Sequence, residues 1–228
     1  MSEREKILAR VREALKEPAH VPGARGTAPL PASAHSAAVG ARQWLPKVGD
    51  SFAEQLALFQ ANATELKADF QLLASREELK IALAKISIAE NWKRIATHKS
   101  ELTDYAGDAL GLPVCWTNGG YDVHDMEACD AGFTECDALI AQTGSVLVTS
   151  RSAGGRALSV LPPHHVVIAR REQLVADLPA AFELLQKKYA ANYPSMISFI
   201  TGPSRTGDIE RILVLGAHGP KKLTILCV

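Results

Sequence analysis

Apolar residues recur along this chain in two patterns, one typical of helices and one typical of short buried strands. In residues 51–68 an apolar side chain returns every three or four positions, as on one face of an amphipathic helix. Short runs of mostly bulky apolar residues, such as 166–169 and 196–200, indicate buried strands. Because helices and strands alternate, we predict an α/β domain with a largely parallel, layered sheet.

The expected elements follow from these runs and from turn and capping residues. Ser75 begins a helix, with Glu78 as its capping-box partner. Another helix is expected at 172–190, where Pro179 would introduce a kink. A Thr-Gly turn at Gly144 permits a positive φ angle or a close approach of the backbone. Strands are expected at 69–74, 94–97, 113–116, 138–141, 146–149, 166–169 and 196–200, with further apolar runs at 212–215 and 223–228.

The first 49 residues differ in character from the predicted domain, which spans 50–228. Residues 2–16 have helical periodicity, with Ser2 and Glu5 as a capping box. Residues 18–40 are rich in Pro, Gly and Ala and show no period, as in an extended linker. We therefore predict an N-terminal helical arm, which either packs on its own domain or docks on a partner.

Composition limits the classes of function. The 228 residues carry no net charge, with a pI near 7.1, so a general basic field for nucleic acid is excluded. No apolar run reaches the length of a membrane span, and the charged N-terminus lacks the apolar core of a signal peptide. We expect a cytoplasmic protein.

The cysteines offer no recognisable cluster or metal site. They are Cys115, Cys129, Cys136 and Cys227, and no pair has C-x-x-C spacing or a His at zinc-finger spacing. An iron–sulfur cluster held by this chain alone is therefore not expected. We predict buried thiols, no metal ion and no cofactor of this chain's own.

Polar loops border the predicted strands at 142–145, 151–165 and 201–210. In an open parallel sheet, such loops meet at the carboxyl edge, where ligands bind. Amides, hydroxyls and guanidinium groups together suit a small carboxylate or phosphate. For residues 201–210, the alternative to a ligand-binding loop is a plain connection between a strand and a helix. The expected ligand-binding residues are Thr143, Gly144, Ser145, Arg156, Thr201, Gly202, Ser204, Arg205 and Thr206.

Three groups, His164, Asp208 and Glu210, are candidates for acid–base chemistry. His164 is favoured for proton transfer, because imidazole titrates near neutral pH. The sequence is equally compatible with a structural role, in which His164 lies in a loop and hydrogen-bonds a carbonyl group. His165 begins a strand, which indicates a structural role. Asp208 and Glu210 lie near the start of an expected helix and would either orient a neighbouring arginine or act as acid and base. His218 lies in a Gly-rich turn. Its position is equally compatible with a structural role in the turn and with contact to a ligand.

Several blocks resemble the signature of the LUD-domain family, that of the lactate-utilisation protein C. They read Ile-Thr-Gly-Pro-Ser-Arg-Thr-Gly-Asp-Ile-Glu at 200–210, Leu-Val-Leu-Gly at 213–216 and His-Gly-Pro at 218–220, with Gln-Thr-Gly-Ser at 142–145 and Leu-Pro-Pro-His at 161–164. The resemblance covers about residues 50–228. Gly207 stands where the family usually has Ala, and Gln142 stands where an acid is common, which argues against a catalytic carboxylate at position 142.

The resemblance implies a Rossmann-like sheet similar to the fold of sugar-phosphate isomerases and CoA transferases. It implies a subunit of a system that oxidises L-lactate to pyruvate with iron–sulfur partner proteins, which would carry the clusters. Two other functions remain open. One is a stand-alone isomerase or transferase on a phosphorylated or CoA-linked substrate, for which Glu135 or Glu210 would be the nucleophile. The other is a non-catalytic assembly or regulatory protein that docks through residues 1–40.

Overall fold

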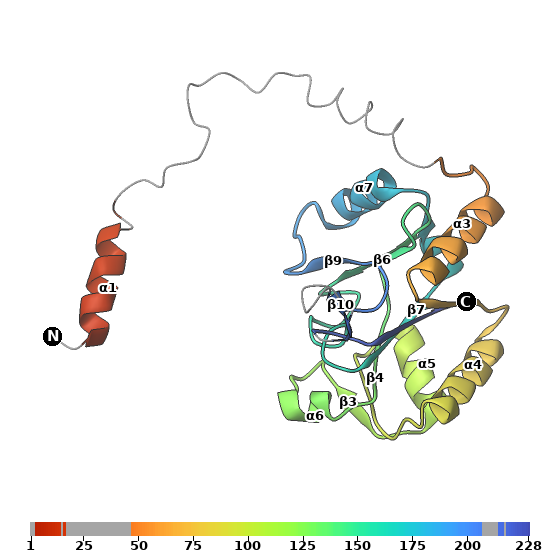
Figure 1. Ribbon diagram of the computed structural model, residues 1–228, viewed down its shortest axis with the longest axis horizontal. Helices are drawn as coiled ribbons and strands as arrows, with labels where there is room; N and C mark the ends of the chain where they lie inside the picture. Colours follow the sequence, from red (N-terminus) through yellow and green to blue (C-terminus); the bar gives the residue numbers. More distant parts are fainter. Residues whose placement is uncertain (1–2, 15, 17–46, 207–213, 217) are drawn as a thin grey trace, which may run out of the picture. The chain divides into compact units, whose positions relative to one another are not determined.

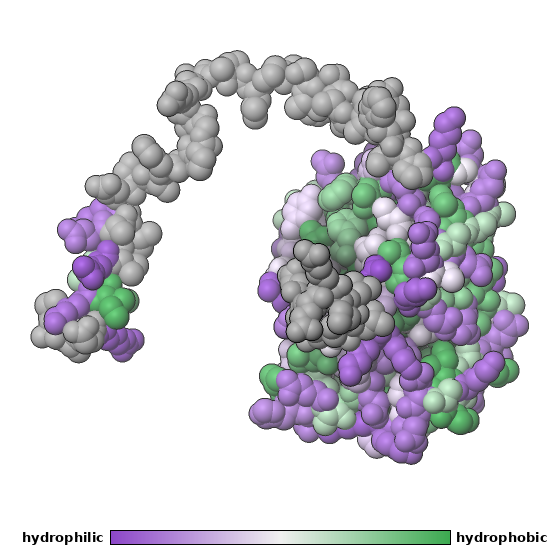
Figure 2. Space-filling model, viewed as in Figure 1, coloured by the Kyte–Doolittle hydropathy of each residue, from purple (hydrophilic) through white to green (hydrophobic). Residues whose placement is uncertain are grey.

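The computed structural model describes residues 3–14, 16, 47–206, 214–216 and 218–228 (Figure 1). The chain divides into two units, residues 1–45 and 46–228. In the first unit, helix α1 runs from Glu3 to Ala14. Its Ile7 and Leu8 side chains are exposed, and Figure 2 shows both hydrophobic and hydrophilic surface on this helix.

A parallel sheet forms the centre of the second unit. Within the described residues its strand order is β1-β12-β7-β4-β2-β3, and neighbouring strands run parallel. The strands are β1 (Asp69–Leu72), β2 (Ile95–Thr97), β3 (Val114–Trp116), β4 (Ala131–Thr134), β7 (His164–Ala169) and β12 (Lys222–Cys227). The last strand of the chain therefore lies inside the sheet, between β1 and β7.

Both faces of this sheet are covered. The helices are α3 (Phe52–Glu65), α4 (Arg76–Ala89), α5 (Glu101–Leu110), α6 (Val123–Glu127) and α7 (Leu178–Tyr189). Leu83 of α4 shares one apolar core with Val166, and Phe59 of α3 shares another with Val167. Since Val166 and Val167 are neighbours in β7, their side chains point to opposite faces of the sheet, so α3 and α4 lie on opposite sides of it (Figure 1).

A second sheet packs on the α3 side. Its order in the described chain is β8-β5-β6-β9, and Leu139, Val146 and Val148 extend the core that contains Phe59. Its strands are β5 (Ala138–Ile140), β6 (Ser145–Thr149), β8 (Leu174–Val175) and β9 (Ile197–Ile200); the short pair β10 (Arg205–Thr206) and β11 (Val214–Leu215) is separate. The predicted tight turn is confirmed, because β5 and β6 pair antiparallel.

A buried carboxylate attaches α7 to the second sheet. Asp137, directly before β5, accepts hydrogen bonds from the Lys188 ammonium and the Tyr189 hydroxyl, each at 2.6 Å. Its side chain is fully buried, and a buried charge requires such partners. Leu185 and Tyr189 complete the contact with apolar surface against Ile140 and Leu147.

Side-chain caps explain where two helices begin. The Ser51 hydroxyl accepts the Glu54 amide, and the Glu54 carboxylate accepts the Ser51 amide, a full capping box. At α4, the Ser75 hydroxyl accepts the amide of Glu78 as predicted. The Glu78 carboxylate, however, accepts the amide of Ala74 at 2.7 Å, so the predicted box at Ser75 is only half formed.

The predicted helix 172–190 is wrong in its first third. Residues 171–173 form a short 3-10 turn (η1, Arg171–Gln173), β8 follows, and α7 begins after Asp177, whose carboxylate caps it. Pro179 therefore lies in the first turn of α7 rather than at a kink. Proline is accepted there because first-turn amides have no partner within the helix.

Elements that do not follow from the apolar pattern include α5, α6 and β4. Strand β4 is not predicted because it contains Gly132, and glycine has a low preference for strands. A Cβ atom at this position would lie 2.3 Å from the Leu158 carbonyl oxygen, so a distant segment requires glycine here. Tertiary packing rather than local preference thus explains this residue in a strand.

The α/β class with a mostly parallel central sheet is confirmed. The finer likeness to sugar-phosphate isomerases and CoA transferases stays a prediction. None of the described helices is long and apolar enough to cross a lipid bilayer.

Candidate functional site

The loop that follows β9 borders a cavity of about 220 Å³, which we call the loop cavity. Its wall is built from five separate parts of the chain: residues before β7, the start of β7, the β9 loop, the turn before β12 and the start of β12. The lining residues are Ser159, Val160, His165, Ile200, Thr201, Gly202, Pro203, Ser204, His218, Gly219, Pro220 and Leu223.

Close backbone contacts hold this loop in place. Gly202 has φ 85°, and a Cβ atom on it would lie 2.6 Å from the Leu66 carbonyl oxygen. Only glycine meets both demands without strain. The Ser204 amide donates to the Pro220 carbonyl at 2.9 Å, and the Gly216 amide donates to the Ser204 carbonyl at 2.8 Å. The Ser204 hydroxyl, rather than its amide, therefore remains for a ligand.

The loop cavity lies at the amino ends of the parallel strands, whereas the sequence pattern predicts the carboxyl edge. His165 and Leu223 are the second residues of β7 and β12. The difference arises because β9 belongs to the second sheet, where it runs antiparallel to β6. The end of β9 therefore meets the beginning, not the end, of the central strands.

An internal ion pair lies at the carboxyl edge of the central sheet, after β4 and β7. Glu135, after β4, accepts the Ser100 hydroxyl at 2.6 Å, the Leu102 amide at 3.1 Å and the Arg170 guanidinium at 2.9 Å. Burial alone would raise the pKa of Glu135, but these donors hold it below its usual value. Glu135 thus caps α5, an arrangement that occupies the oxygens a nucleophile would need.

His165 is the most deeply buried polar group of the loop cavity. Its side chain is 1% exposed, and its Nε2 atom shares a hydrogen bond of 2.9 Å with the Thr134 hydroxyl. Burial lowers the pKa of His165 to about 3, so the ring is neutral at physiological pH. Its Nδ1 atom is buried and has no hydrogen-bond partner within the described residues.

His164 points to the opposite face of the sheet from His165, because the two are neighbours in β7. It is the first residue of a strand rather than a loop residue. Its Nε2 atom shares a 2.9 Å hydrogen bond with the Thr224 hydroxyl, and its ring lies edge-on to Trp92. Burial lowers the pKa of His164 to about 4. The structure therefore separates it from the hydroxyl groups of the loop cavity.

The turn 142–145 contacts the loop through one residue. The buried Ser145 hydroxyl lies 2.8 Å from the Thr201 hydroxyl. Gly144 has φ 64°, and a Cβ atom there would lie 2.6 Å from the Ala63 amide nitrogen of α3. Thr143 shares this turn but does not line the loop cavity. None of these three predicted residues lines the loop cavity, and Ser145 contacts Thr201, which does.

The predicted cations lie outside the loop cavity. The Arg156 guanidinium donates to the Ser195 carbonyl at 2.6 Å on the protein surface. Arg205 is exposed, and Thr206 beside it pairs with Val214 across β10 and β11. Asp208 and Glu210, together with the helix expected around them, lie outside the described residues. In the described chain, the loop cavity has no lysine or arginine in its wall.

The four cysteine thiols are buried and free. Burial raises the pKa of Cys129 and of Cys227 to about 11, and that of Cys136 well above its ordinary value. Thiols of this kind stay protonated, whereas metal ligation requires the thiolate. The described residues form no group of three or more His, Cys, Asp or Glu side chains suited to a metal ion.

Residues outside the expected ligand-binding set complete the wall. Ser159, Val160 and Pro220 line the loop cavity, and His165 and His218 supply its imidazoles. A period of two in β7 shows that His164 and His165 face opposite ways. It does not show which of them faces the loop, because that depends on how β9 crosses the central strands.

The LUD domain family matches residues 123–228, which include the whole loop cavity. Lactate utilization protein C of Geobacillus sp. (strain WCH70) is 31% identical over 165 residues, which cover 66% of this chain and 68% of that protein. The chain belongs to the LUD-domain family. The proteins of the same name from Anoxybacillus flavithermus (34% identical) and Shouchella clausii (37%) match over 49% and 46% of this chain. In both, the chain spans about half of the relative's length.

A solved structure supports the fold of this LUD-domain protein. It is a DUF162 family protein from Deinococcus radiodurans, with a TM-score of 0.63. The likeness covers 79% of this chain and 99% of that one at 23% identity. It shows that the fold is shared, and nothing further.

Proposed function

We propose that this LUD-domain protein is a subunit of a system that oxidises L-lactate to pyruvate and that it binds a small 2-hydroxy or 2-oxo carboxylate in the loop cavity. The relatives named lactate utilization protein C support the first part. The oxidation removes two electrons and two protons, which need an acceptor. We place the iron–sulfur clusters that take the electrons on partner proteins, consistent with the buried thiols of this chain.

The Nδ1 atom of His165, which has no hydrogen-bond partner among the described residues, carries the proposal for the loop cavity. A buried polar atom without a partner is unfavourable, and a ligand hydroxyl or carbonyl at this place would satisfy it. The Thr201 and Ser204 hydroxyls and His218 border the same space and suit a carboxylate. Val160 and Leu223 provide apolar wall for a methyl group. The absence of Lys and Arg from the described wall favours a monoanion over a phosphate.

Isothermal titration calorimetry with L-lactate, pyruvate and inorganic phosphate tests ligand binding. We expect heat from L-lactate or pyruvate, and weaker binding of phosphate. Ser204→Ala and His218→Ala should each weaken binding by about fivefold or more, because each removes a hydrogen bond worth about 1 kcal/mol. His124→Ala serves as the control, since His124 is exposed on α6 and lies outside the cavity.

The role in the cell has its own test. A strain that lacks this gene should regain growth on L-lactate with the wild-type chain and with His124→Ala, but grow poorly with Ser204→Ala or His218→Ala. Normal growth with both cavity variants, together with no heat from either carboxylate, would retire the proposed site.

A further inference from the structure

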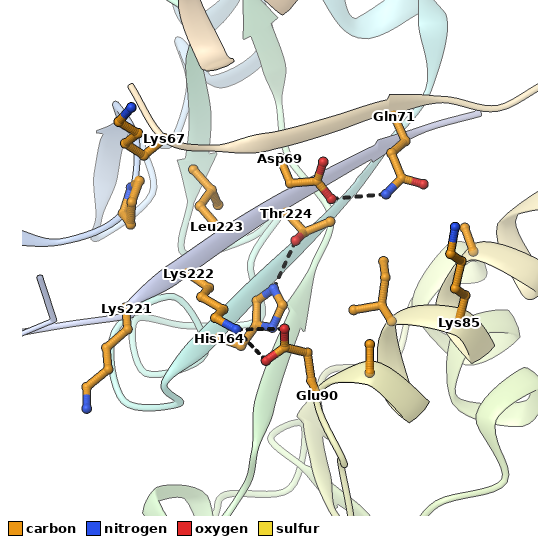
Figure 3. Close-up of a pocket in the computed structure, with 14 residues that line it drawn as sticks. Lys67, Asp69, Gln71, Lys85, Glu90, His164, Lys221, Lys222, Leu223 and Thr224 are labelled. Atoms are coloured by element: carbon orange, nitrogen blue, oxygen red, sulfur yellow. Dashed lines mark hydrogen bonds and ion pairs between the residues drawn. The ribbon is translucent and has the colours of Figure 1, made fainter. Parts of the chain in front are cut away.

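A larger cavity, of about 370 Å³, lies beside the loop cavity on the α4 side of the central sheet (Figure 3). We call it the lysine cavity. It lies between the second half of α4 and strands β1 and β12, and Pro203 and Leu223 line both cavities. Its lining residues are Lys67, Asp69, Gln71, Ala82, Lys85, Ile86, Ala89, Glu90, His164, Pro203, Lys221, Lys222, Leu223 and Thr224.

Positive charge exceeds negative charge in this wall. Four lysines face two acids, and the Lys222 ammonium lies 2.6 Å from the Glu90 carboxylate. Within the described residues, Lys67, Lys85 and Lys221 form no ion pair. In Figure 3, Lys67 and Lys221 stand on one side of the cavity and Lys85 on the other. Lysines from three separate segments therefore line one cavity, and in Figure 3 the side chains of Lys67 and Lys221 extend outward from its edge in different directions.

Polar groups form part of the floor of the lysine cavity, beside apolar side chains of α4. The His164–Thr224 hydrogen bond crosses it, and the Asp69 carboxylate accepts the Gln71 amide at 3.0 Å (Figure 3). The buried Nδ1 atom of His164 has no partner in the described chain. Such a floor can bind hydroxyl groups, while the lysines supply charge.

Lys67 occupies a backbone position that favours glycine. It has φ 69° after the end of α3. Its amide donates to the Thr64 carbonyl and the Ala68 amide donates to the Ala63 carbonyl, the pattern of a Schellman motif, in which glycine is usual. The lysine side chain is thus present despite a backbone cost.

We propose that the lysine cavity binds a phosphorylated small molecule that carries at least two negative charges and hydroxyl groups. The loop cavity, without Lys or Arg in its described wall, suits a monocarboxylate, whereas three lysines that form no ion pair with the described residues suit a phosphate. This site goes beyond the proposed role in lactate oxidation and does not depend on it. The two ligands would bind on either side of Pro203.

Calorimetry with pyrophosphate at low ionic strength tests the charge of the site. Lys67→Gly and Lys85→Ala should each weaken pyrophosphate binding by about threefold to tenfold, and Lys80→Ala by less than about twofold. Lys80 is the matched control, because it is an exposed lysine of α4 outside the cavity. Lys67→Gly should leave the melting temperature unchanged or raise it, so weaker binding would not reflect unfolding.

Two results would overturn the site: no binding of pyrophosphate to the wild-type chain, or equal affinities for Lys67→Gly, Lys85→Ala and Lys80→Ala. Glucose 6-phosphate should bind more tightly than inorganic phosphate, and equal affinity would refute the contribution of hydroxyl groups. L-lactate binding should be the same in all three variants. This separates failure of the lysine cavity from failure of the loop cavity.

Discussion

Three histidines are buried as neutral imidazoles on the central strands and their ends. His98, His164 and His165 are 4%, 5% and 1% exposed, and burial lowers the pKa of each below its ordinary value. Because a charged imidazole in these places would lose its hydration, the fold accepts only the neutral ring. These buried histidines therefore make the protein sensitive to acid.

We predict that the free energy of unfolding falls as the pH drops below 6.5. The unfolded histidines titrate near 6.5, while His164 and His165 titrate at about 4 and about 3 in the folded chain. Between these values the unfolded chain binds more protons, so acid favours unfolding, by about 1 kcal/mol for each histidine and pH unit. Urea denaturation at pH 7, 6 and 5 measures this slope.

Two histidine variants test whether the dependence of stability on pH comes from a buried histidine. His164→Gln should make the dependence on pH visibly shallower, whereas His124→Gln should not change it, since the His124 side chain is 91% exposed. An identical slope in wild type and His164→Gln would show that His164 is not held neutral.

At the scale of elements, the contact between the β5–β6 turn and α3 fixes how the second sheet lies on the first. The Asn62 side-chain amide donates to the carbonyls of Ala141 and Gln142 at 2.9 and 3.0 Å. Gly144 lies against the same turn of the helix. This close packing in turn places Ser145 beside Thr201, so the candidate site depends on it.

Gly144→Ala should destabilise the fold far more than Gly111→Ala. The two glycines have nearly the same φ, 64° and 61°, so both changes add the strain of a left-handed residue, about 1 kcal/mol. At Gly144 the new Cβ atom would also clash with α3, whereas nothing lies within 4 Å at Gly111. We expect a total loss of about 3 kcal/mol for Gly144→Ala, measured by thermal and urea unfolding. Equal losses would mean that the turn can move away from α3.

At the scale of the whole molecule, α1 carries apolar side chains that face solvent. Ile7 and Leu8 are 59% and 41% exposed (Figure 2), and side chains of this kind suit a partner helix or groove. Docking of the N-terminal arm on a partner protein remains a prediction. It can be tested by removing the arm, because the arm belongs to a separate unit of the chain.

Removal of residues 1–45 should abolish co-purification of the partner proteins and leave the melting temperature of unit 46–228 unchanged. In the full chain, the double change Ile7→Asp and Leu8→Asp should have the same effect, because it places charge on the apolar face. Arg12→Ala, an exposed polar position of the same helix, is the control. Partners that still co-purify with the truncated chain would contradict docking through this arm.

Local sequence was enough to determine several features of this protein. The apolar period and the Ser51 and Ser75 caps place α3 and α4, and the Thr-Gly turn places the β5–β6 hairpin, because each depends on contacts within a few residues. The motif around Thr201 likewise identified the family and a loop that borders a cavity.

Tertiary structure alone decided which residues meet. The pattern in β7 shows that His164 and His165 face opposite ways, but the crossing of β9 over the strand ends decides that His165 faces Thr201. The lysine cavity joins Lys67 and Lys85 to Lys222 at the far end of the chain, because the last strand inserts beside β1. Such long-range pairings depend on how whole sheets pack, and no local pattern of apolar residues records them.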